Sequence, residues 1–299
     1  MTTGRFAPTP SGELHLGNLR TALLSWLFPR SVGGRFLLRV EDLTTGAEPR
    51  CQEEQLDDLA AIGLDHDGEV VVQSERTERY AAALGRLIAE GRTYPCFCSR
   101  RDIREAAAAP HGPSIEGGYP GTCRRLDPDE AAERVARGER AALRLRAEQC
   151  VVGFTDRLHG AIEEPVDAFV VRRADGVVAY NLAVVIDDDE QGVDQVVRGD
   201  DLVHTTPRQV LVQQLLGLST PEYVHVPLVH GADGERLAKR HGAISLRAQL
   251  AEGRSVAEVV SRLGVSIGLA SPGETVDAAE LLARFDPDDV HVADTLPPV

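Results

Sequence analysis

The chain has 299 residues, of which 32 are lysine or arginine and 47 are aspartate or glutamate, so its formal net charge is −15. This excess of anions argues against a protein that binds nucleic acid through a broadly basic surface. The 42% hydrophobic and 26% charged residues are typical of a globular protein with a sizeable core, and they exclude disorder, collagen and a small disulfide scaffold.

Membrane insertion and secretion are not expected either. No run approaches the roughly 18 apolar residues of a membrane span. The N-terminus lacks a basic stretch followed by an apolar one, which a secretion signal requires. We therefore expect a cytoplasmic protein with no membrane contact.

Strands and helices alternate along the first 90 residues. Residues 4–7 form a short predicted strand, and the Pro/Ser/Gly turn after it leads into a helix over 13–28, for which Ser11 is the expected N-cap. A strand over 33–40 follows, and then helices over 50–62 and 77–90. This alternation predicts a parallel α/β sheet, in which ligands bind where strands end and helices begin.

The pattern changes over residues 95–147, where three cysteines, a run of alanines and a Gly/Pro-rich stretch indicate an insertion into the α/β domain. Beyond the insertion the α/β pattern returns, and helical segments are expected near 255–264 and 277–284. The elements expected between these two regions are strands over 169–173 and 177–180 around an Asp175-Gly176 turn, a strand over 193–197, a helix over 206–216 and a strand over 223–229.

Two short motifs suit phosphate binding. His15-Leu-Gly17-Asn18 opens the first helix, where unpaired N–H groups and the helix dipole attract anions and a glycine lets a nucleotide approach the backbone. The five-residue segment Arg236-Leu-Ala-Lys239-Arg240 contains three cations and lies in an otherwise acidic part of the chain. Lys239 is the one lysine beside 31 arginines, which indicates a position that needs a compact, flexible ammonium.

The charge is unevenly spread, because residues 1–150 carry −3 and residues 151–299 carry −12. A polyanion is therefore expected to contact the first half or a local basic patch.

The five cysteines are an odd number, which favours reduced thiols or a metal site over disulfides. Cys96, Cys98 and Cys123 can bind one tetrahedral Zn²⁺ as thiolates. The residue types alone leave the fourth ligand open between His111, Cys150 and water. Cys51 and Cys150 are otherwise expected to be inert.

The two phosphate motifs resemble the HIGH and KMSKS signatures of class I aminoacyl-tRNA synthetases. Asn18 stands in place of the last histidine of HIGH, and Arg236, Ala238 and Arg240 replace the first lysine and the two serines of KMSKS. Further segments are similar to glutamyl- and glutaminyl-tRNA synthetases, and together they run from residue 4 to about 246. They are Gly4 to Gly12, Arg39 to Asp42, Tyr180 to Asp188, Val197 to Asp201 and Thr206 to Gln209.

The resemblance implies a Rossmann-like catalytic domain over residues 1–94 and 148–243, with an inserted zinc-binding, acceptor-type subdomain over 95–147. Residues 244–299 would form a short helical C-terminal region. Only 49 residues follow Leu250, which is short for an anticodon-binding domain. The chain therefore resembles the truncated glutamyl-queuosine tRNA(Asp) synthetase branch. That branch activates L-glutamate with ATP and transfers it to the queuosine base in the anticodon of tRNA(Asp).

The site residues carry over from the resemblance position by position. It implies one structural Zn²⁺, Mg²⁺ with ATP, and a monomer. Catalytic roles fall on His15, Gly17, Asn18 and Lys239, and ATP contacts on His15, Gly17, Arg236 and Lys239. Glutamate contacts fall on Arg5, Phe6, Ala7, Pro8, Thr9, Glu41, Tyr180 and Arg198, and the zinc ligands are Cys96, Cys98, Tyr119 and Cys123.

Two other functions remain open from the sequence. One is a class I aminoacyl ligase that acts on another acceptor, such as a carrier protein or a small amine. The other is a non-catalytic binding module that keeps the synthetase fold, against which the intact His15, Gly17 and Lys239 count.

Overall fold

A computed structural model describes residues 1–99, 101–103, 119, 121–147, 150–231, 237 and 244–296. Its main sheet has the strand order β3-β2-β1-β9-β10-β6-β7. The strands from β3 to β6 run parallel, and β7 pairs with β6 as an antiparallel hairpin at the edge. This confirms the predicted parallel α/β sheet. The bounds are β1 Thr3–Phe6, β2 Arg35–Val40, β3 Val71–Val72, β6 Cys150–Asp156, β7 Gly160–Val166, β9 Gln195–Gly199 and β10 Glu222–Val226.

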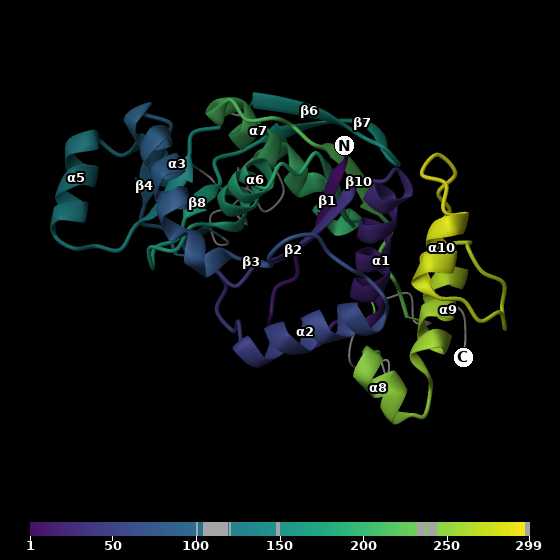
Figure 1. Cartoon of the computed structure of the whole chain (residues 1–299). Helices are drawn as coiled ribbons and strands as arrows, with labels where there is room; N and C mark the ends of the chain where they lie inside the picture. Colours follow the sequence, from purple (N-terminus) through teal and green to yellow (C-terminus); the bar gives the residue numbers. More distant parts are fainter. Residues whose placement is uncertain are drawn as a thin grey trace.

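Helices cover both faces of this sheet (Figure 1). Side chains alternate along each strand, so Phe36 and Leu38 pack in the core with α1, whereas Leu37 packs in the core with α3, α6 and α7. Burial on both faces is what parallel sheets require. The helices are α1 Leu16–Ser31, α2 Pro49–Ala61, α3 Thr77–Ala89, α6 Tyr180–Glu190 and α7 Thr206–Leu216, with short 3-10 helices η1 Gln73–Arg76 and η3 Asp200–Thr205.

Two smaller parts lie at opposite ends of the molecule (Figure 1). At one end an antiparallel sheet of order β4-β5-β8 joins α5 and the short helix η2. At the other end α8, α9 and α10 follow the main sheet, and α9 and α10 pack against α1. The bounds are β4 Thr93–Cys96, η2 Thr122–Arg125, α5 Pro128–Ala136, β5 Ala142–Leu145, β8 Val170–Arg172, α8 Leu246–Ala251, α9 Val256–Ser266 and α10 Ala278–Arg284.

The structure corrects two expectations. The prediction of a strand over 177–180 is wrong. Val178 forms only an isolated β-bridge with Arg172, and Tyr180 is the first residue of α6. Most of α6 is buried, so its apolar run lacks helical periodicity. The N-cap of α1 is His15 and not Ser11. The sequence also missed the β6–β7 hairpin and α8.

No helix among the described residues is long and apolar enough to cross a membrane.

Asp58 of α2 makes stability depend on pH. Burial raises the pKa of this carboxyl to about 6, although Arg247 lies 3.2 Å away. Between pH 4 and 6 the folded chain therefore holds a proton that the unfolded chain releases, so this group contributes less stability as pH rises. We expect Asp58→Asn to raise the melting temperature at pH 8 but not at pH 4. An equal change at both pH values in thermal melts would contradict this.

Candidate active site

A cavity of about 750 Å³ opens at the carboxyl ends of the central strands, beside the start of α1. Parallel sheets bind ligands at this edge. Segments far apart in the sequence meet there, because the end of β1, the loop after β2 and the start of α6 each contribute to the wall. The predicted site residues that line the cavity are Phe6, Ala7, Pro8, Thr9, His15, Gly17, Asn18, Glu41 and Tyr180.

The HIGH-like motif forms a capping box at the start of α1. The His15 Nδ1 atom accepts a hydrogen bond from the Asn18 backbone N–H at 3.1 Å, and the Asn18 Oδ1 atom accepts one from the His15 N–H at 3.2 Å. Asn18 therefore fixes the backbone around His15. A Cβ atom on Gly17 would lie 3.0 Å from the His15 ring and 3.3 Å from Val229, so glycine is needed for this packing.

Buried charges lie behind the part of the cavity that Glu41 and Tyr180 line. Arg5 does not line the cavity, and its Nε atom donates to Asp188 at 3.1 Å. Arg39 contacts Asp188 at 2.8 Å and Glu41 at 3.4 Å. Burial raises the pKa of Glu41. Burial also acts to raise that of Asp188, but the two guanidinium groups outweigh it and hold the Asp188 pKa below its ordinary value.

Arg198 also lies behind the wall and reaches the cavity through Tyr180. Its Nη1 atom donates to the Tyr180 hydroxyl at 3.4 Å, and its Nη2 atom donates to Thr206 at 2.7 Å. Arg198 is buried, whereas Tyr180 is 37% exposed. The structure therefore brings Arg198 and Tyr180 together, but Arg198 contacts the cavity only indirectly.

Several lining residues were not predicted, among them Gln55, Gln73, Arg173 and Asp201. Gln55 of α2 donates to the carbonyls of Thr9 and Gly12 at 3.0 and 2.7 Å, which holds the loop before α1. Asp201 ends one of the segments quoted for the resemblance, so that segment could have pointed to it. The other three have no local signal, because only the fold brings them to the cavity.

The KMSKS-like residues Arg236 and Lys239 lie outside the described residues, as does His111. The described neighbour Leu237 donates its backbone N–H to the carbonyl of Val229 at 2.9 Å. Val229 lines the cavity. Leu237, two residues before Lys239, is thus bonded to the cavity wall.

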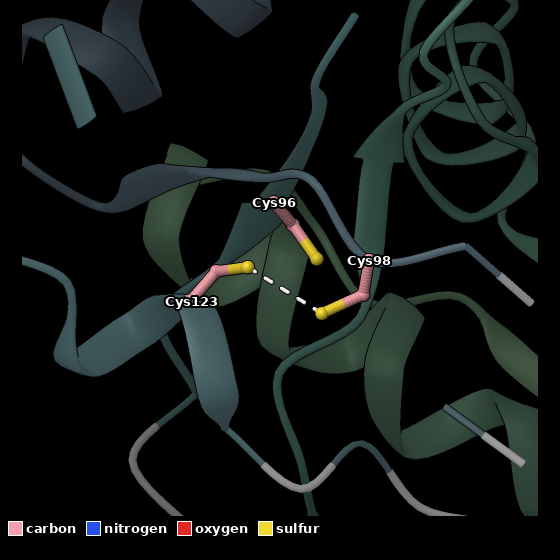
Figure 2. Close-up of side chains that lie close together, drawn as sticks. All are labelled: Cys96, Cys98 and Cys123. Atoms are coloured by element: carbon pink, nitrogen blue, oxygen red, sulfur yellow. Dashed lines mark hydrogen bonds between the residues drawn. The ribbon is translucent and has the colours of Figure 1, made fainter. Parts of the chain in front are cut away.

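The three predicted cysteines converge between β4 and η2 (Figure 2). Their sulfur atoms all lie within 4.8 Å of one another, and those of Cys98 and Cys123 are 3.4 Å apart. The Tyr119 hydroxyl lies 3.4 Å from the Cys96 sulfur and 3.9 Å from that of Cys98. Cys150 packs instead in the core formed with α3, α6 and α7.

Hydrogen-bond donors face two of these sulfurs, whereas burial raises the pKa of the Cys98 thiol to about 12. Arg144 donates to the Cys96 sulfur at 3.3 Å, and the Phe97 N–H donates to Cys123 at 3.4 Å. Although burial acts to raise it, such hydrogen bonds hold the Cys123 pKa below its ordinary value. Three converging sulfurs with donors behind them are compatible with tetrahedral Zn²⁺.

Comparisons with known proteins agree with this geometry. The family described as "tRNA synthetases class I (E and Q), catalytic domain" matches residues 1–289. A protein of Nocardia farcinica named glutamyl-Q tRNA(Asp) synthetase is 58% identical over 95% of this chain and 89% of its own. One of Symbiobacterium thermophilum with the same name is 49% identical over 96% of this chain and 93% of its own.

Among solved structures, a glutamate tRNA ligase from Elizabethkingia meningosepticum in complex with its amino acid superposes with a TM-score of 0.85 at 24% identity. The match covers 98% of this chain but only 66% of that one. At this identity the match shows the shared fold.

The parallel sheet and the cavity beside α1 define a class I synthetase catalytic domain, and the chain is an enzyme of the ligase class. The chain belongs to the glutamyl/glutaminyl class I tRNA synthetase family, in the branch whose members are named glutamyl-Q tRNA(Asp) synthetase.

Proposed function

We propose that this enzyme activates L-glutamate with ATP and transfers it to the queuosine base of tRNA(Asp). The observation that carries the proposal is that eight residues predicted to bind ATP or glutamate line one cavity, together with Asn18, which was predicted to be catalytic. The relatives that are 58% and 49% identical over nearly their whole length carry the matching name.

The first step joins glutamate to AMP. A glutamate α-carboxylate oxygen attacks the α-phosphorus of ATP, the bond from that phosphorus to the bridging oxygen breaks, and pyrophosphate leaves with the electron pair. His15 and the N–H groups at the start of α1 hold the phosphates, and Arg236 and Lys239 neutralise the leaving group. Mg²⁺ accompanies the nucleotide.

The amino acid occupies the end of the cavity near Glu41 and Tyr180. Glu41 binds the α-ammonium group, and residues 6–9 line the pocket. Tyr180 donates to the side-chain carboxylate, and Arg198 and Arg5 provide positive charge behind it. In the second step an acceptor hydroxyl attacks the glutamyl carbonyl and AMP leaves.

The test is transfer of radiolabelled glutamate in the presence of ATP to tRNA from queuosine-containing and queuosine-deficient cells. We expect label on the queuosine-containing tRNA alone. Label on both would support a class I ligase with another acceptor. Absence of glutamate-dependent exchange between ATP and pyrophosphate would support a non-catalytic binding module.

We also propose that Cys96, Cys98, Tyr119 and Cys123 hold one structural Zn²⁺, which fastens η2 to the end of β4. The Tyr119 hydroxyl accepts a hydrogen bond from the Cys123 N–H at 2.8 Å, so it lies within this cluster. An ion held by these residues would stabilise the subdomain, and none of its four ligands lines the cavity.

We expect Cys98→Ser to lose most of the bound zinc, since two sulfurs hold the ion more weakly than three. The rate of ATP–pyrophosphate exchange should stay within about threefold of wild type, because the cluster lies outside the cavity. Elemental analysis and exchange assays measure the two effects. Cys150→Ser is the matched control, and equal zinc content in the two variants would contradict this ligand set.

A further inference from the structure

A chain of buried side chains holds Arg198 from behind. Adjacent parallel strands β9 and β10 pair Arg198 with His225, so the two side chains project from the same face. The Arg198 Nε atom donates to the His225 Nε2 atom at 3.0 Å. Arg198 is 6% exposed and His225 is fully buried. Three edges of the guanidinium group are thus occupied, by His225, Thr206 and the Tyr180 hydroxyl.

Asp156, at the end of β6, holds His225 in turn. Its Oδ2 atom accepts from the His225 Nδ1 atom at 2.7 Å and from the His225 backbone N–H at 3.0 Å. Its Oδ1 atom accepts from the N–H groups of Leu158 and His159 at 2.9 and 3.0 Å. Four donors around one buried carboxyl keep it ionised, and burial, which acts to raise its pKa, is outweighed.

These partners determine the protonation of His225. A carboxylate only accepts hydrogen bonds, so Nδ1 carries the hydrogen. A guanidinium only donates, so Nε2 must be the unprotonated acceptor. Burial lowers the pKa of His225, and the charge of Arg198 adds to this against the opposing effect of Asp156. His159, whose Nε2 atom lies 3.1 Å from the His225 carbonyl, also acts to lower it.

We propose that Asp156 and His225 are positioning residues for amino-acid recognition, because a neutral His225 holds the Arg198 guanidinium in the orientation that places Nη1 at the Tyr180 hydroxyl. This inference rests on the proposed function for its substrate, glutamate. Neither residue lines the cavity, so both act through Arg198. The Tyr180 hydroxyl oxygen accepts a hydrogen bond from Arg198, and the hydroxyl proton of Tyr180 therefore points away from the arginine. That proton is then available to a carboxylate in the cavity that Tyr180 lines.

Two variants break the chain in different ways. Asp156→Asn keeps the size but fails in both amide orientations, since its NH₂ group faces either the Nδ1–H of His225 or the N–H groups of Leu158 and His159. His225→Leu removes the acceptor for Nε. His225→Gln supplies an amide oxygen in its place. Tyr223, on the same strand as His225, provides the matched control. Tyr223→Phe removes a buried hydrogen bond that Gln213 of α7 donates to the Tyr223 hydroxyl, and it leaves the bonds of Arg198 intact.

The first measurement is steady-state ATP–pyrophosphate exchange. We expect Asp156→Asn and His225→Leu to raise KM for glutamate about tenfold, with KM for ATP within about twofold. His225→Gln should recover part of the loss, and Tyr223→Phe should match wild type. Unchanged KM for glutamate in a folded His225→Leu or Asp156→Asn variant would overturn the proposal. Inactivity of the wild-type protein would instead refute the proposed function.

The second measurement does not depend on activity. In ¹⁵N spectra of histidine-labelled protein, with the His225→Gln spectrum identifying the signals, His225 should show a protonated Nδ1 and an unprotonated Nε2 at pH 7. An imidazolium, or a neutral ring protonated at Nε2, would overturn the proposal whether or not the protein catalyses exchange, and even where Asp156→Asn does not fold.

Discussion

Replacement of Lys239 by alanine is expected to lower the rate of glutamate-dependent ATP–pyrophosphate exchange by about 10²–10³-fold. The reason is that negative charge grows on the leaving pyrophosphate, and removal of one preorganised group that meets such charge has an effect of this size. Leu237, two residues before Lys239, donates its N–H to the carbonyl of Val229, which lines the cavity. The measurement is the exchange rate at saturating ATP and glutamate.

Two controls separate position from charge. Lys239→Arg keeps the cation but replaces a flexible ammonium with a planar fork, so we expect an intermediate rate. Arg137→Ala removes an exposed cation after α5, far from the cavity, and should leave exchange unchanged. If Lys239→Ala and wild type exchange pyrophosphate equally fast, the role assigned to Lys239 is wrong.

The sequence predicted the positions that the backbone topology alone brings together. Phe6 ends β1 and residues 7–9 follow it, Glu41 follows β2, and His15 is the N-cap of the helix between the two strands. Parallel strands place their carboxyl ends at one edge of the sheet. The α/β alternation was therefore enough to predict that these residues lie close together. Tyr180 joined them only through the family resemblance, since its local pattern indicated a strand where the structure has the start of α6.

What the sequence could not predict is how the buried charges pair. Arg5 and Arg198 were expected to bind the substrate carboxylate directly, yet Arg5 pairs with Asp188, 183 positions along the chain. Arg198 donates to His225 on the neighbouring strand. No local periodicity encodes such partners, because they depend on strand order and register. The roles of both arginines in glutamate binding stay predictions, now as charges that lie behind the cavity wall.

The net charge can now be compared with the proposed RNA partner. The −15 total counts against a broadly basic surface. Residues 1–150, which include the cysteine cluster and α5, have a net charge of −3, whereas residues 151–299 have a net charge of −12. A tRNA stem-loop that approached from this side would meet less repulsion than one that approached the second half.

Asp188→Asn is expected to cost about 3–5 kcal/mol of unfolding free energy, the usual result of removing one partner from a buried ion pair. Asp188 neutralises two buried arginines at once, at 3.1 Å from Arg5 and 2.8 Å from Arg39. An amide would remove the one negative charge that contacts both guanidinium groups. Asp189→Asn, an exposed neighbour on α6, is the matched control and should stay within about 0.5 kcal/mol of wild type.

The pH dependence of this loss follows from the lowered pKa of Asp188. A carboxyl whose folded pKa lies below its unfolded value of about 3.9 contributes stability above that value, and the contribution disappears as pH falls through the folded pKa. The difference between wild type and Asp188→Asn should therefore be full at pH 7 and shrink below about pH 4. Urea unfolding at pH 7, 5 and 3.5 measures it. A difference that stayed constant over this range would show that Asp188 acts through packing and not through its charge.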